Sequence, residues 1–315
     1  MKPRDIIAKA WTLTKKGKQI RRWGFLHSFF RTLLNAKLFF FQSWLAYSYF
    51  ILKDPIGFGE METVLWHNTP HWFSISIIVL FLTLLVVELL FPHMARGAII
   101  GLAAKSYKKE EVKGGLVLAI YNFFPLFAVH EILVLSGITT TITLCSLSLR
   151  YGGVAGPIAC IILLSIWIVS TIIEFFWIFT EEAIVIRKIG IGKAIRQSVK
   201  LVLSYLGHVV FLLLLLFVII LRIVANLLML ILVPAIVLAF GLLFASFMPP
   251  FISYTISSLL GIVIIFFASY LLAYLEVFRQ TVWTITYMEL CKEKELDIID
   301  IESAITPTEE NEVDA

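Results

Sequence analysis

Long stretches of apolar residues are the feature that most constrains the fold of this chain. A helix needs about 20 predominantly apolar residues to cross the hydrocarbon core of a bilayer. A soluble chain could not cover such stretches with polar surface, since only 15% of the residues are charged, against about 25% in a typical soluble domain. We therefore predict an all-α, polytopic membrane protein with six transmembrane helices. The six apolar stretches lie at about 24–52, 72–96, 114–148, 156–186, 205–247 and 251–288.

Basic residues are concentrated in alternate connections between these stretches. Eight Lys or Arg precede residue 24, and five stand in each of the connections 93–114 and 187–204. The other three connections contain at most one cation each. Because cytoplasmic loops of membrane proteins carry the excess of Lys and Arg, we predict a multi-pass protein of the plasma membrane with both termini in the cytoplasm.

The same pattern divides the chain into three parts. Residues 1–23 are predicted to form a cytoplasmic basic amphipathic segment, and residues 24–290 the six-helix transmembrane domain. Residues 291–315 are predicted to be an acidic cytoplasmic tail that is disordered, because eight acidic residues and no cation follow from Glu295 onward. The stretch 205–247 is long enough for one or two crossings and contains Pro234; one crossing, ending near residue 232, is preferred.

Residues 4–16 and 192–204 each show the periodicity of an amphipathic helix. In the second segment, Lys193, Arg196 and Lys200 recur at intervals of three and four residues along one face. Apolar residues occupy the other face of each helix. Both helices are therefore predicted to lie on the inner surface of the membrane, the first with Trp11 as its anchor.

Cations in and just before the second amphipathic segment are candidate contacts for the headgroups of anionic inner-leaflet lipids. A cation near an anionic membrane surface contributes about 1 kcal/mol. Alternatively, these cations only set the orientation of the chain in the membrane and bind no particular lipid. Nucleic acid is not expected as a partner, because no basic patch stands on a folded soluble face. The candidate lipid contacts are Arg187, Lys188, Lys193, Arg196 and Lys200.

Ionisable residues inside predicted spans are costly in a bilayer and mark candidate functional sites. Counting about 1.5 Å per residue from the cytoplasmic helix ends places four of them deep in the membrane, with opposite charges at matching depths. We predict that Lys37, Glu131, Glu174 and Arg222 form an intramembrane charged layer, in which Arg222 and Glu131 lie at the same depth and are candidate partners. Two interpretations stay open: interhelical ion pairs that fix packing, or a polar pathway for an ion, a proton or a lipid headgroup.

Motifs for catalysis or metal binding are not found. His130 and Glu131 do not begin an HExxH motif, since Val134 stands at its last position. The three cysteines form no CxxC pair. We therefore expect no enzymatic activity, no cofactor and no metal site.

Four stretches carry a resemblance to a known group of proteins: IIAKAWTLTKK, RGAIIGLAAKSYKKEEV, FTEEAIVIRKIGIGKAIRQSVKLVLSYLGHV and FRQTVWTITYMEL. Their order resembles a broad group of bacterial and archaeal six-helix membrane proteins. That group includes the membrane domain attached to some glycerophosphoryl diester phosphodiesterases. The resemblance implies a six-helix fold with basic cytoplasmic loops. It implies no activity, because no soluble part of this chain is long enough to form the catalytic barrel.

A non-enzymatic integral membrane protein is the function that these patterns favour. Such a protein would act as a scaffold for other membrane proteins or contact anionic lipid through its inner basic helices. The alternative is a small transporter or channel that uses the buried charged layer between helices.

Overall fold

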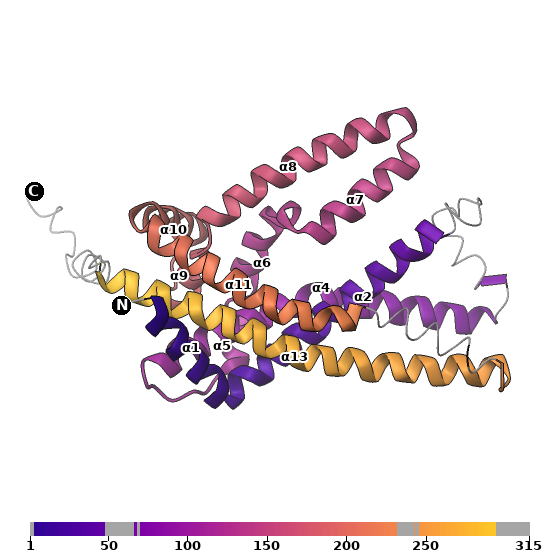
Figure 1. Cartoon of the computed structure of the whole chain (residues 1–315), viewed down its shortest axis with the longest axis horizontal. Helices are drawn as coiled ribbons and strands as arrows, with labels where there is room; N and C mark the ends of the chain where they lie inside the picture. Colours follow the sequence, from indigo (N-terminus) through magenta and orange to yellow (C-terminus); the bar gives the residue numbers. More distant parts are fainter. Residues whose placement is uncertain (1–2, 48–65, 68–69, 232–242, 244–245, 294–315) are drawn as a thin grey trace, which may run out of the picture.

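The computed structural model describes residues 3–47, 66–67, 70–231, 243 and 246–293, and within them every regular element is a helix. The all-α prediction is therefore confirmed for this part of the chain (Figure 1). The principal helices are α1 (Pro3–Lys16), α2 (Lys18–Tyr47), α4 (His71–Tyr107), α5 (Gly115–Tyr121), α6 (Phe123–Ile132), α7 (Ile138–Tyr151), α8 (Gly156–Phe176), α9 (Thr180–Arg187), α10 (Ile191–Ser204), α11 (Leu206–Ile231) and α13 (Pro250–Glu293). Short 3-10 turns, η2 (Val134–Ser136) and η3 (Gly153–Ala155), flank α7.

Three helical segments are long and apolar enough to cross a membrane: Ser74–Tyr107, Gly153–Phe176 and Leu259–Glu293. Two bent pairs of helices raise this number to five if each pair is one span. Helix α5 meets α6 at 52°, and α10 meets α11 at 92°. The described residues thus contain three to five candidate spans, and the number six stays a prediction.

The expected continuous helix over 114–148 is broken in the structure. Helix α5 ends at Tyr121 and α6 begins at Phe123. Pro125 has no N–H to donate to the carbonyl group one turn earlier, which favours a kink at this point. The 3-10 turn η2 and Gly137 then separate α6 from α7.

Three other predicted boundaries also differ from the structure or leave its described part. Helix α8 ends at Phe176, so the stretch 156–186 is not one helix but α8 followed by α9. Helix α13 continues to Glu293, two residues beyond the predicted start of the tail, and 294–315 lie outside the described residues. Helix α11 reaches Ile231, and most of 232–247, including Pro234, also lies outside them.

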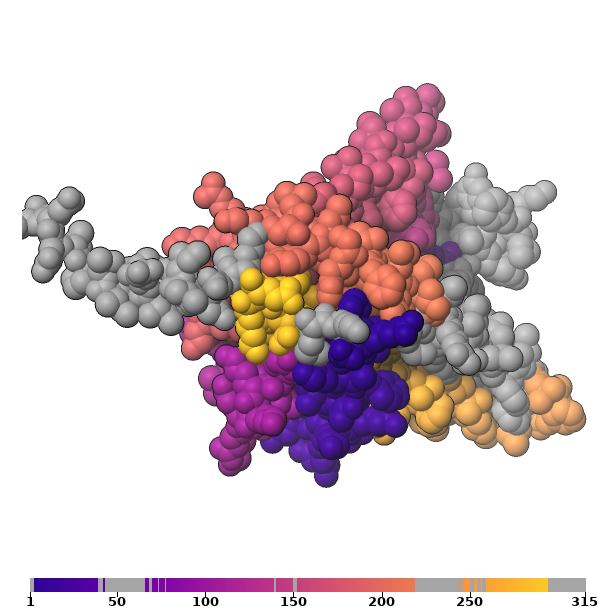
Figure 2. Space-filling model, turned by 60° about the vertical axis from the view of Figure 1, so that its left-hand side comes forward, coloured from indigo at the N-terminus to yellow at the C-terminus, as the bar shows by residue number. Residues whose placement is uncertain are grey.

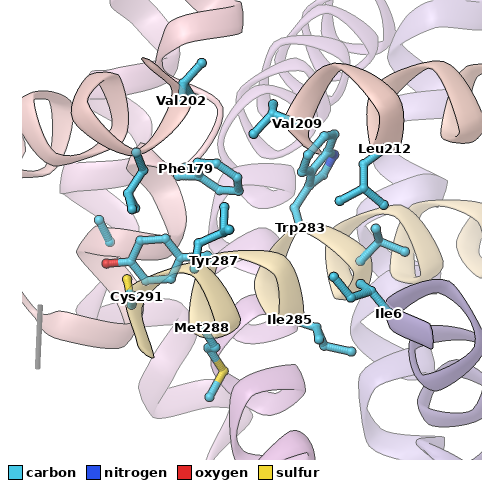
Figure 3. Close-up of a cluster of buried hydrophobic side chains, with 14 of the residues drawn as sticks. Ile6, Phe179, Val202, Val209, Leu212, Trp283, Ile285, Tyr287, Met288 and Cys291 are labelled. Atoms are coloured by element: carbon cyan, nitrogen blue, oxygen red, sulfur yellow. The ribbon is translucent and has the colours of Figure 1, made fainter. Parts of the chain in front are cut away.

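The principal hydrophobic core lies around the C-terminal half of α13. Phe179, Trp283 and Tyr287 are buried there, and the rings of Phe179 and Trp283 meet edge to face at 5.9 Å (Figure 3). Side chains of α1, α10 and α11 complete this core. In Figure 2 the end of α13, in yellow, is surrounded by segments from several parts of the chain. Aromatic burial therefore ties the sequence-distant elements together at this end.

The other end of the molecule exposes apolar side chains. Helices α7 and α8 form a hairpin that projects away from the core (Figure 1). The most apolar stretch of α8 contains no buried residue, and Ile161, Ile162 and Val169 are more than half exposed. Exposed apolar side chains along a whole helix are typical of a membrane-facing or protein-binding region.

Both predicted amphipathic helices pack against the protein itself. Helix α1 buries Ile6, Ala10 and Thr14, and its neighbour is α13. Trp11, the expected membrane anchor, lies edge-on against Phe278 at 5.6 Å. Helix α10 likewise buries Ala194, Ser198, Leu201 and Val202. The apolar faces of α1 and α10, from which we predicted helices on the membrane surface, are thus covered largely by the protein core.

Ser198 sets the orientation of α10. Its Oγ accepts a hydrogen bond from the Phe179 N–H at 3.0 Å and donates one to the Phe176 carbonyl oxygen at 2.8 Å. These bonds satisfy backbone groups in the turn between α8 and α9, which would otherwise be buried without partners. Because Ser198 faces inward, the residues on the opposite side of α10 must face outward.

Candidate functional site

The outward side of α10 presents three cations, Lys193, Arg196 and Lys200, which we call the basic face. All three side chains are exposed. No ion pair to them is found among the residues that the structure describes. Their charges are therefore available to an anion outside this part of the molecule.

The other two candidate lipid contacts stand at the end of α9. Arg187 is the last residue of that helix and is half-buried. Lys188 is exposed and takes a left-handed conformation with φ 55°, which terminates the helix. Its Nζ lies 5.9 Å from the centre of the Tyr121 ring. The five predicted residues thus divide into the basic face and a separate pair.

The predicted charged layer is distributed over several environments. Lys37 Nζ donates a hydrogen bond to Glu88 Oε1 at 2.6 Å, and the Glu88 side chain is fully buried. Glu131 and Glu174 are exposed. Arg222 belongs to α11, but its side chain lies outside the described part of the structure. Its pairing with Glu131 therefore stays a prediction.

A different set of polar side chains meets where α2, α4, α9 and α13 converge. Arg96 Nη1 donates to Glu181 Oε1 at 2.7 Å. Arg279 Nη2 donates to Glu276 Oε1 at 2.7 Å. We call this set the polar junction; it comprises His27, Arg96, Glu181, Glu182, Glu276, Arg279 and Gln280.

The sequence alone does not predict the polar junction, because its members come from distant parts of the chain. Glu276, Arg279 and Gln280 do give a local signal, since spacings of three and four residues put them on one side of a helix. In the sequence, Arg96 belongs to the basic connection 93–114 and Glu181 to the apolar stretch 156–186. Only the packing of α4 against α9 brings these two together.

Close helix contact beside the junction depends on Gly24. A Cβ at Gly24 would clash with Val277 Cγ2 and lie 3.2 Å from the Ala273 carbonyl oxygen. Glycine therefore lets α2 approach α13 one turn before His27. Small residues commonly permit such approach between membrane helices.

Glu182 is the junction residue whose charge state is most affected by burial. Its Oε1 accepts a hydrogen bond from Gln280 Nε2 at 2.8 Å, while its Oε2 has no partner among the described residues. Burial and the neighbouring Glu181 raise the pKa of Glu182 to about 8, against the opposing effect of Arg96 and Arg279. This carboxyl group is therefore largely protonated at neutral pH.

Replacing Glu182 by Gln should remove a pH dependence of stability. A carboxyl group whose pKa is raised on folding stabilises the protein fully below its unfolded pKa, near 4.5. That contribution is lost as the pH rises toward 8. Unfolding measurements in detergent should show Glu182→Gln matching the wild type near pH 4 and exceeding it by about 5 kcal/mol near pH 9. A constant difference between the two proteins across this range would contradict the assignment.

The described residues contain no group of three or more His, Cys, Asp or Glu side chains placed to hold a metal ion. His93 and His130 do face each other, with ring centres 4.2 Å apart. The geometry thus offers two distinct features: an exposed basic face and a buried polar junction. No family model, curated protein or solved structure matches this chain.

Proposed function

We propose that this chain is a non-enzymatic integral membrane protein that binds anionic lipid through the basic face of α10. The observation that carries the proposal is the arrangement of Lys193, Arg196 and Lys200, exposed opposite a buried helix face. We place it in the plasma membrane with six passes and both termini in the cytoplasm, as the distribution of cations predicts. Membership in the group that includes the phosphodiesterase membrane domains is part of the same proposal.

The bend between α10 and α11 supports this placement of the basic face. Helix α10 meets the apolar helix α11 at 92°. If α11 crosses the membrane, α10 runs along the membrane surface, at the level of the headgroups. Lys and Arg side chains at this level keep their charged ends in the polar region while their aliphatic stems cover apolar surface.

Lipid binding should be tested by reconstituting the full chain with spin-labelled lipids. Changing Lys193, Arg196 and Lys200 together to Gln should lower the preference for phosphatidylglycerol over phosphatidylcholine by about tenfold or more. Each cation contributes about 1 kcal/mol, and a loss of about 1.4 kcal/mol is already tenfold. The wild-type preference should also fall as salt is added, since salt screens exposed charges.

A matched triple variant controls for net charge. Lys108, Lys109 and Lys113 are also exposed cations, but Glu110 and Glu111 stand among them. Changing these three to Gln should reduce the lipid preference by less than twofold. An unchanged preference in the α10 variant, or an equal loss in the control, would overturn binding at the basic face.

A further inference from the structure

His27 is a buried histidine with an oxygen atom near each of its ring nitrogens. Its side chain is 2% exposed. Nδ1 lies 2.9 Å from the Pro92 carbonyl oxygen of α4. Nε2 lies 3.5 Å from Glu276 Oε1 of α13 and has no hydrogen-bond partner among the described residues. The imidazole ring of α2 therefore links the three longest helices of the described structure.

A neutral His27 beside an ionised Glu276 cannot satisfy both ring nitrogens. A neutral imidazole has one N–H and one nitrogen lone pair. The Pro92 carbonyl oxygen can only accept a hydrogen bond, and an ionised Glu276 can also only accept. With the hydrogen on Nε2, the Nδ1 lone pair faces the Pro92 oxygen at 2.9 Å. With the hydrogen on Nδ1, Nε2 is left without a donor, 3.5 Å from a carboxylate oxygen. One more proton resolves this conflict.

We propose that His27 and Glu276 together bind one proton at the point where α2, α4 and α13 meet. On His27 the proton makes an imidazolium that donates to the Pro92 oxygen and forms an ion pair with the Glu276 carboxylate. On Glu276 it makes a carboxylic acid that donates to Nε2, while Nδ1–H still donates to Pro92. In both arrangements the pair holds one proton more than a neutral histidine and a carboxylate.

Several arginine side chains surround the pair of His27 and Glu276. Arg279 Nη2 donates to the same Glu276 oxygen at 2.7 Å. Arg31 from α2, Arg96 from α4 and His130 from α6 also lie within electrostatic reach of His27, and Arg96 is paired with Glu181 of α9. Nearby cations weaken the binding of a further positive charge. The proton is thus held by the two oxygen atoms and opposed by the arginines.

The location couples the proton to helix packing. Gly24, which lets α2 pack closely against α13, lies one turn before His27, and its neighbour Val277 follows Glu276 directly. Loss of the proton either leaves Nε2 without a donor beside a carboxylate oxygen or sets the Nδ1 lone pair against the Pro92 oxygen. The contact between α2 and α13, or between α2 and α4, should then loosen. This site is separate from the basic face and does not depend on lipid binding.

Nitrogen-15 NMR of the full chain in bilayers tests the proposal directly. The signals of His27 can be assigned by their loss in a His27→Asn variant, in which the amide can still donate to Pro92. At about pH 7, Nδ1 should be protonated, and either Nε2 should also be protonated or infrared spectra should show a protonated Glu276. A neutral His27 beside an ionised Glu276, in either tautomer, would overturn the proposal.

The Glu276→Gln variant provides a second, independent measurement. Its side-chain amide can donate to His27 Nε2, so that no additional proton is needed. His27 in this variant should stay neutral from about pH 5 to pH 9. Glu289→Gln changes a carboxyl group on the same helix that instead contacts Tyr107 and Lys292, and it should leave the His27 signals as in the wild type. A His27 titration in Glu276→Gln that matches the wild type would contradict the shared proton.

Discussion

Replacing Arg96 by Leu is expected to destabilise the protein by about 3–5 kcal/mol, because it leaves Glu181 partly buried without its partner. The Arg96 and Glu181 side chains are 12% and 18% exposed, and their nitrogen and oxygen atoms lie 2.7 Å apart. Burial makes removal of one partner costly, since the remaining charge cannot regain its hydration. Unfolding in mixed detergent micelles, followed by tryptophan fluorescence, should measure this loss.

The double variant Arg96→Leu with Glu181→Leu separates the ion pair from side-chain packing. Two apolar side chains of similar volume often replace a buried ion pair with little change in stability. The double variant should therefore be more stable than Arg96→Leu by about 2 kcal/mol or more. A double variant as unstable as the Arg96→Leu single variant would show that Glu181 is not the partner that matters.

Adding a side chain at Gly24 is the second change expected to have a large effect. Even Gly24→Ala places a Cβ against Val277 Cγ2, and the β-branched Val277 side chain has little rotamer freedom in a helix. Overpacking of this kind costs about 1–3 kcal/mol. We expect Gly24→Ala to lower the midpoint of thermal unfolding in detergent, and Gly24→Leu to lower it further.

Two comparisons identify the source of the Gly24 effect. Val277→Ala removes the clashing methyl groups, so it should restore part of the stability lost in Gly24→Ala. Gly192→Ala is the control, because nothing lies within 4 Å of a Cβ at that helical position. It should be neutral or stabilising by about 0.5–1 kcal/mol through helix propensity. Failure of Val277→Ala to rescue Gly24→Ala would argue against close contact between α2 and α13.

The basic face shows how far local periodicity can predict a site. The spacing of Lys193, Arg196 and Lys200 placed them on one face of a helix, and all three are exposed on α10. What covers the opposite face could not be predicted. Lipid and a protein core offer similar apolar surroundings, so the same periodicity suits either. The structure shows Leu201 and Val202 buried in the core.

The charged layer shows where depth counting fails. Counting residues from a helix end assumes a continuous straight helix. The chain bends at Asn122 and turns again at 133–137, so the position of Glu131 does not follow from such a count. Lys37 pairs with Glu88, a residue that is not among the four predicted members of the layer. Ion pairs between helices depend on rotation about each helix axis, which hydropathy does not report.

Composition and short-range periodicity alone determined that this chain is helical, that long parts of it are apolar enough to cross a membrane, and that α10 carries cations along one face. These properties depend on residues within a few turns of one another. Tertiary structure decided which helices break, which amphipathic faces are covered, and which charges meet in the polar junction. The reason is physical: a buried charge is stabilised by whichever opposite charge packing brings within a few ångströms, and that partner can lie anywhere in the chain.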